Sequence, residues 1–87
     1  MSSYKLTIAS PDGNLFEGQV YSLSLRGVEG ELAILAHHVP FITSVVPCIC
    51  RIEEQDGTER TGKTSGGILT VSGEETVLLA SDFCFDE

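Results

Sequence analysis

The chain has 87 residues, and 41% of them are hydrophobic, which is enough for the core of one small domain. Thirteen acidic residues against five basic ones give a net charge of −8. This balance excludes nucleic acid and anionic membrane surfaces as partners, because both require a surface rich in Lys and Arg. An odd number of cysteines and an N-terminus without the apolar core of a signal peptide predict a reducing compartment rather than a secreted disulfide scaffold.

Short segments of apolar or alternating residues follow one another along the chain, and no stretch before residue 81 shows the apolar stripe of a helix. Alternation is the period of a half-buried strand, and a short continuous apolar run indicates a buried one. The predicted strands cover residues 4–8, 19–26, 32–35, 41–46, 48–54, 59–64, 68–71 and 76–80. Turn residues separate them at roughly eight- to twelve-residue spacing, which predicts an all-β fold: an antiparallel two-sheet β-sandwich or flattened barrel, in a single domain over residues 1–87.

The last segment, residues 81–87, breaks this pattern. It holds Phe83 and Phe85 among acidic residues, with no later strand to pack against. Ser81 or Asp82 suits the cap of a helix. We therefore expect residues 81–87 to be the start of a helical region that continues past Glu87.

Candidate catalytic and metal-binding residues are few. His37 and His38 are adjacent, so on an extended chain they point to opposite sides and do not converge on one metal ion. Cys48 and Cys50 share one strand face, but structural zinc needs four ligands. The sequence contains no Gly-x-Ser-x-Gly elbow and no glycine-rich phosphate loop ahead of a helix. We expect free thiols, no metal, no cofactor and no catalytic site within this chain.

An acidic turn and the strand after it hold the strongest candidate for a binding site. Gly27 and Gly30 permit a tight reversal around Glu29 and just before Glu31, and His38 follows the next strand. Carboxylates in such a turn suit a partner with basic loops. A solvated turn of a sandwich accounts for the same residues without any function.

Several motifs occur together in a fixed order. They are Gly27-Val-Glu-Gly-Glu-Leu-Ala-Ile-Leu, His38-Val-Pro40, Arg51-Ile52, Ser65-Gly66-Gly67-Ile68-Leu69 and Val77-Leu78-Leu79-Ala80. In this order and spacing, over about residues 4–80, the chain resembles the N-terminal β-sandwich domain of the epsilon subunit of F-type ATP synthase. The family's C-terminal helical hairpin, which binds nucleotide in some members, has no counterpart in these residues, so no ATP-binding residue is assigned.

The resemblance implies a noncatalytic central-stalk (rotor) subunit of the ATP synthase complex. Such a subunit fastens the gamma subunit to the polar loops of the membrane c-ring and supports the coupling of ion translocation to ATP synthesis. It meets the catalytic alpha/beta head only indirectly, and lies at the cytoplasmic side of the bacterial inner membrane without inserting into it. Carried over residue by residue, Glu29, Gly30, Glu31 and His38 fall on the ring-facing region.

Two other interpretations remain open from the residues alone. One is a free-standing β-sandwich module that binds a protein or a small ligand and resembles the family incidentally. The other is a Cys/His metal protein, which is disfavoured because the histidines and cysteines do not have the spacing of a four-ligand set. Co-purification with a gamma subunit distinguishes the rotor subunit from both.

Overall fold

A computed structural model describes residues 2–36, 39–73 and 75–86. The described residues form nine strands. Their bounds are β1 (Tyr4–Ser10), β2 (Gly13–Gly27), β3 (Gly30–Leu35), β4 (Phe41–Val45), β5 (Cys48–Glu54), β6 (Glu59–Thr64), β7 (Gly67–Val71), β8 (Glu75–Ala80) and β9 (Phe83–Phe85). Within these ranges there is no helix that is long and apolar enough to cross a membrane.

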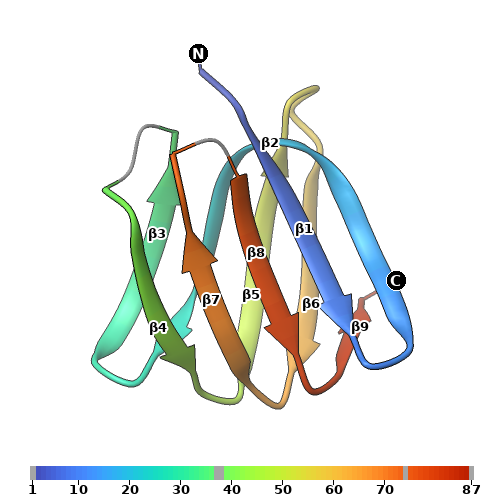
Figure 1. Ribbon diagram of the computed structural model, residues 1–87. Coiled ribbons are helices and arrows are strands. Elements are labelled where there is room, and N and C mark those ends of the chain that lie inside the picture. The colour runs from blue at the N-terminus through green and yellow to red at the C-terminus, as the bar shows by residue number, and fades with distance from the viewer. Residues whose placement is uncertain (1, 37–38, 74, 87) are drawn as a thin grey trace.

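The strands lie in two layers (Figure 1). The front sheet has the order β4, β7, β8, β1, and the back sheet has the order β3, β2, β5, β6, β9. The long strand β2 joins the layers, because it pairs with β1 along its first half and with β5 along its second. On the other side, Gly27 of β2 pairs with Val45 of β4. The predicted sandwich or flattened barrel is confirmed, with one addition: β1 and β8 pair in parallel.

Each of the predicted strands is present, with small differences at the ends. β5 and β6 have the predicted bounds, whereas β2 begins at Gly13 rather than at residue 19. The reason is the β1–β2 hairpin, whose pairing continues down to Ser10 opposite Gly13. Gly13 has a φ of 128°, which only glycine adopts readily, and this conformation lets the chain reverse tightly there.

The last described residues form a strand, so the expectation that a helix begins at Ser81 or Asp82 is wrong. β9 pairs with the edge of β6. The Asp82 carboxylate does cap backbone, but in a turn: its Oδ1 accepts a hydrogen bond from the Ser65 amide at 2.8 Å. Its Oδ2 accepts a second from the Ser65 hydroxyl at 3.0 Å. The capping group that suggested a helix therefore fastens the β6–β7 turn to the β8–β9 connection.

The aromatic side chains of β9 do have a surface to pack against. The ring of Phe85 lies 4.9 Å from that of Phe83 and 6.0 Å from that of Phe16, between centroids. The guanidinium of Arg60 lies 4.1 Å from the Phe85 centroid, a cation–π contact. Phe83 occupies the space over Gly62, where an added Cβ would come within 2.6 Å of its ring.

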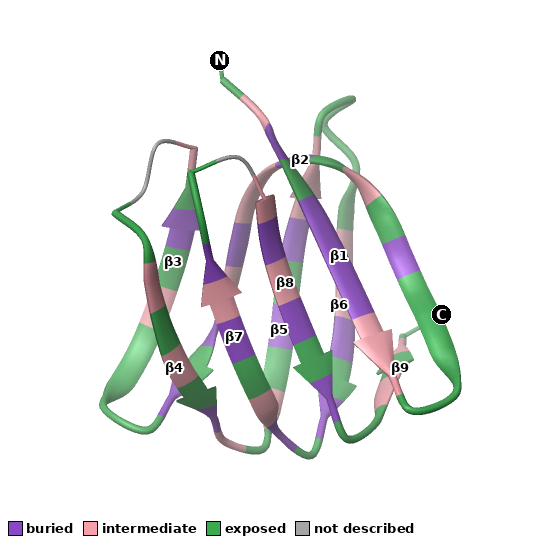
Figure 2. Cartoon of the chain, in the orientation of Figure 1, coloured by how far each residue is buried: buried purple, intermediate pink, exposed green. Residues whose placement is uncertain are grey.

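The core lies between the two sheets, and buried residues alternate with more exposed ones along most of the strands (Figure 2). The buried apolar residues are Tyr4, Leu6, Ile8, Phe16, Val20, Leu23, Leu25, Ile34, Val45, Cys50, Ile52, Leu69, Val71, Leu78 and Ala80. Tyr4 links the sheets, because its hydroxyl donates a hydrogen bond of 2.7 Å to the carbonyl oxygen of Ile34. Burial raises the pKa of Tyr4, so this donor stays protonated.

Candidate functional site

The acidic turn, residues 27–31, joins β2 to β3 in a narrow conformation. Gly30 has a φ of 128°, which side-chain-bearing residues rarely adopt. A Cβ on Gly27 would lie 3.3 Å from the carbonyl oxygen of Ser44. The same oxygen accepts a hydrogen bond of 3.1 Å from the amide of Val28, so β4 holds the turn from the side. The two glycines therefore permit the tight conformation of this turn, and the hydrogen bond to β4 restricts it to that conformation.

The carboxylates of the acidic turn are exposed to solvent. Glu31 has a side chain that is 80% exposed and an Oε2 that lies 3.3 Å from Nη2 of Arg26. Glu29 is also exposed, next to Val28, which is 62% exposed at the tip. An exposed ion pair contributes at most about 1 kcal/mol to stability, so Glu31 can exchange Arg26 for another cation at small cost. The turn therefore presents one exposed apolar side chain, Val28, beside two available carboxylates.

The remaining predicted site residue, His38, lies outside the described residues. Its described neighbour Ala36 directly follows Leu35 at one end of β3, whereas the acidic turn adjoins the other end, at Gly30 (Figure 1). A strand of this length separates its two ends by roughly 17–20 Å. The structure thus brings together the turn residues of the predicted site but not the neighbours of His38.

A second surface, which the sequence analysis did not single out, is the outward side of the front sheet. The strand register places eight uncharged residues there in two adjoining rows. The apolar front face consists of the row Ile42, Thr70, Val77 and Thr7 and the row Ser44, Ile68, Leu79 and Ala9. Ile42 is 71% exposed, Leu79 53% and Ile68 43%. Ile68 and Leu79 are register partners in this face, and exposed apolar side chains that gather on one side of a sheet indicate an interaction surface.

The sequence does carry a signal for the apolar front face. Residues 68–69 and 77–80 are continuous apolar runs, where an ordinary sandwich strand with one solvated face alternates apolar with polar. A strand that is apolar on both sides is typical of one covered on both sides. These runs predicted strands, and the side of each strand that faces away from the core had no assignment from the sequence.

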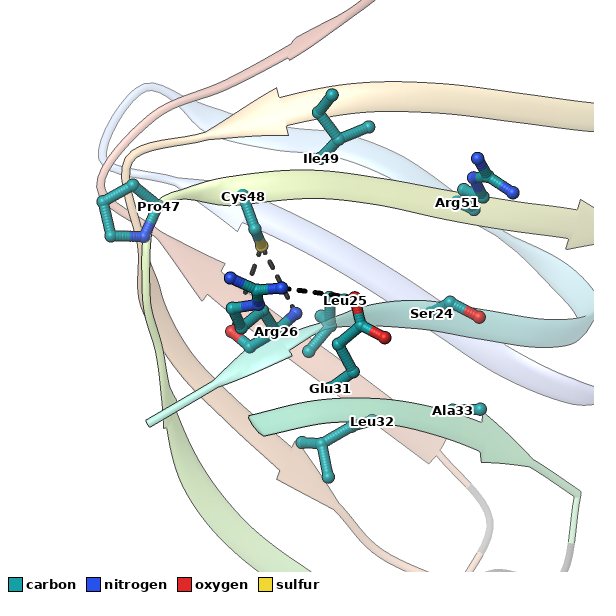
Figure 3. A pocket seen from close by; sticks show the side chains of 10 residues that line it. All are labelled: Ser24, Leu25, Arg26, Glu31, Leu32, Ala33, Pro47, Cys48, Ile49 and Arg51. Atoms are coloured by element: carbon teal, nitrogen blue, oxygen red, sulfur yellow. Dashed lines mark hydrogen bonds and ion pairs between the residues drawn. The ribbon is translucent and has the colours of Figure 1, made fainter. Parts of the chain in front are cut away.

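A groove of about 690 Å³ lies on the outward side of the back sheet, across β3, β2 and β5 (Figure 3). Its lining residues are Ser24, Leu25, Arg26, Glu31, Leu32, Ala33, Pro47, Cys48, Ile49 and Arg51. At one end the Arg26 backbone amide donates to Sγ of Cys48 at 3.4 Å. The described part of the chain contains no group of three or more His, Cys, Asp or Glu residues able to hold a metal ion. The groove offers a concave surface with the charged side chains of Arg26, Glu31 and Arg51 to a binding partner.

The three cysteines differ in exposure: Cys50 is buried, Cys48 half-buried and Cys84 exposed. Burial, with a smaller contribution from Cys48, raises the pKa of Cys50 to about 12, so that it is a thiol at neutral pH. Only thiolates react rapidly with alkylating reagents. We predict that maleimide at pH 7.5 modifies Cys84 first and Cys50 only after unfolding, and that elemental analysis finds no stoichiometric zinc. One zinc per chain, or equal labelling rates for all three cysteines in the folded protein, would contradict this.

Comparison with known proteins identifies the fold further. A family model described as the beta-sandwich domain of the ATP synthase Delta/Epsilon chain matches residues 3–85. The chain superposes on one from the Euglena gracilis mitochondrial ATP synthase (OSCP/F1/c-ring, rotational state 1) with a TM-score of 0.90 and 22% identity, covering 98% of this chain and 54% of that one. Another match is in the central stalk/c-ring of the Tetrahymena thermophila mitochondrial ATP synthase, with a TM-score of 0.76 and 16% identity, covering 94% and 66%. The chain thus spans about half to two thirds of these proteins.

Proposed function

This chain belongs to the family of ATP synthase delta/epsilon chains that share the β-sandwich domain, and from that premise we propose that it is a noncatalytic part of the central stalk, which fastens the gamma subunit to the c-ring. The observation that supports this best is the presence of two separate surfaces on one closed sandwich: the apolar front face and the acidic turn. A joint that transmits torque needs a stiff body with a permanent attachment and a second contact. A close-packed sandwich is such a body.

In this proposal the apolar front face is the attachment to the gamma subunit. Long-lived interfaces are more apolar than the rest of a protein surface and lack charged side chains in their centre. The front face has this composition, with Ile42, Ile68 and Leu79 exposed and no charge in either row. Each Å² of apolar surface removed from water contributes about 25 cal/mol. This contribution comes from burial itself, so the attachment does not depend on ion pairs that salt would screen.

The acidic turn is the contact with the c-ring. Glu29 and Glu31 are exposed and can form charge-assisted hydrogen bonds with basic polar loops of the ring. Gly30 sets the conformation that presents them. His38, outside the described residues, keeps the ring-facing role carried over from the family as a separate part of the proposal. The contact with the alpha/beta head is indirect, through the gamma subunit.

The proposed location is peripheral, at the membrane that carries the ring. The resemblance to the epsilon subunit makes this the cytoplasmic side of the bacterial inner membrane, whereas both similar solved structures are mitochondrial. Neither location requires insertion, because the sandwich would reach the membrane through the polar loops of the ring. Membrane fractions of the source organism, with the ATP synthase retained, should contain the protein and release it when the catalytic head and stalk are stripped off.

Charge reversal at the acidic turn tests the ring contact. We expect Glu31→Lys to lower ion-driven ATP synthesis in the reconstituted complex at least about threefold, because a lysine would repel basic ring loops. The free energy of unfolding should fall by about 1 kcal/mol at most, because the substitution removes only the exposed ion pair with Arg26. The matched control is Glu59→Lys, an exposed carboxylate on β6 of the back sheet.

Three results are informative. Unchanged synthesis and coupling in Glu31→Lys would contradict the ring-facing assignment and leave the acidic turn a solvated loop. A loss that is equal in Glu59→Lys would mean that overall charge matters rather than position. A free-standing binding module predicts that no variant of this chain affects ATP synthesis, and that no gamma subunit co-purifies with it.

A further inference from the structure

The basic side chains of this acidic protein divide into two groups. Lys5 lies 3.9 Å from both Glu17 and Glu75, Arg26 lies 3.3 Å from Glu31, and Arg60 lies 3.8 Å from Glu54. Arg51 and Lys63 form no ion pair with any carboxylate of the described residues. Both are exposed. Their nearest carboxylates stand further off: Glu53 follows Arg51 by two residues on β5, and Asp86 accepts a hydrogen bond of 3.1 Å from Thr61, the register partner of Arg51. In a chain with thirteen acidic residues, two adjacent cations that form no ion pair are a distinctive local arrangement.

These two cations lie around one exposed apolar side chain on the back sheet. Ile49 on β5 is 55% exposed and pairs in register with Lys63 on β6. Arg51 follows Ile49 by two residues, so both project from the same side of β5. Neighbours across a strand pair lie about 5 Å apart, and neighbours along one face about 7 Å. Ile49 thus has a cation on each of two sides.

The groove on the back sheet begins next to this cluster. Ser24 pairs with Arg51 on one side and with Ala33 on the other, so two small side chains lie between the taller ones and form the floor. The ion pair of Arg26 on β2 and Glu31 on β3 lies at one end of the groove. Ile49 and Arg51 lie along its β5 side (Figure 3). The volume of about 690 Å³ is sufficient for several side chains of a docked segment.

We propose that this back-face groove, with Ile49 and Arg51 at its edge and Lys63 next to Ile49 on β6, docks a segment of a partner protein in which carboxylates flank an apolar side chain. The argument is charge complementarity. A net charge of −8 repels an acidic segment from the protein as a whole, and this is where the described surface offers two cations free of acidic partners. The apolar side chain would pack on Ile49 above the floor, and its carboxylates would pair with Arg51 and Lys63. The surface lies on the opposite sheet from the apolar front face and does not depend on the rotor role.

Photo-crosslinking in the native assembly tests this. Ile49 is replaced by p-benzoyl-phenylalanine in the full natural protein, expressed in its source cells, and adducts are isolated under denaturing conditions and sequenced by mass spectrometry. We expect an adduct with a segment of another protein that contains at least two Asp or Glu residues. Arg51→Gln together with Lys63→Gln should reduce its yield about tenfold. Lys5→Gln removes a charge from the front sheet and should leave the yield unchanged.

The proposal would be overturned if no protein adduct formed, or if the adduct were with lipid, with a basic segment, with a second copy or with this chain itself. An adduct yield that the double substitution does not change would also overturn it. A second probe, at Ile68 on the apolar front face, reports separately on the proposed function. If Ile68 traps no gamma subunit while Ile49 traps an acidic segment, the rotor assignment fails and the back-face groove stands. The reverse pattern removes only the groove.

Discussion

Replacement of Gly67 by alanine is expected to abolish the fold of the domain or to lower its melting temperature by more than about 10 °C. Gly67 begins β7 and pairs with Ala80 at the end of β8. An added Cβ would collide with the carbonyl oxygen of Leu79 and lie 2.9 Å from the Cα of Ala80. These are backbone atoms of the paired strand, which cannot turn aside as a flexible side chain can. The β7–β8 pair must separate at that end to admit the methyl group.

Thermal and urea unfolding of the two proteins side by side measures the effect. Gly73→Ala is the matched control, because a Cβ there would meet no atom within 4 Å. Its free energy of unfolding should change by less than about 0.5 kcal/mol. Equal melting temperatures for Gly67→Ala and the original protein would show that β7 and β8 can move apart without loss, contrary to the contact described here.

Local signals were sufficient wherever the structure is decided by neighbours in the chain. The β5–β6 hairpin has the predicted bounds because its turn has its own chemistry. Gly57 has a φ of 93°, and the Asp56 carboxylate accepts a hydrogen bond of 2.9 Å from the amide of Thr58. The hydrogen bond from the Thr58 amide lowers the pKa of Asp56, because it stabilises the charged carboxylate. Such a turn fixes the register of both strands from within a few residues.

Signals failed where the deciding contact comes from far along the chain. Phe83 and Phe85 looked unpartnered because nothing near them in the sequence offers a surface. Gly62 on β6 leaves the space that Phe83 fills, and Phe16 on β2 supplies part of the surface under Phe85. The parallel pairing of β1 with β8 joins the two ends of the chain in the same way. The alternation of apolar and polar residues within a short stretch of sequence contains no information on either contact.

The candidate site shows the same division. The glycines of the acidic turn predicted its position and its exposed carboxylates, because the turn is a local structure. The grouping of His38 with Glu31 came from the resemblance to the epsilon subunit, and β3 lies between the acidic turn and Ala36, the described residue nearest before His38 in the chain. The apolar front face was missed because a run such as residues 77–80 does not reveal whether its second side faces a core or a partner.

The apolar front face supports the prediction with the largest expected effect on function. Leu79→Asp places a charge in the centre of the proposed attachment, beside Ile68. Leu79 is 53% exposed, so the folded domain should tolerate the change with a loss of less than about 1 kcal/mol. In the bound state the carboxylate would be removed from water without a partner, which costs several kcal/mol. Affinity for the gamma subunit should therefore fall at least about a hundredfold.

The measurement is binding of the full natural protein to purified gamma subunit, with a melting curve of each variant. Leu35→Asp is the control, because Leu35 is 57% exposed on β3 of the back sheet and the substitution is chemically identical. We expect it to bind gamma like the original protein. If Leu79→Asp also binds normally, the front sheet is not the attachment, and another face of the sandwich must carry the joint. If both variants lose binding, the defect lies in charge or folding rather than in the apolar front face.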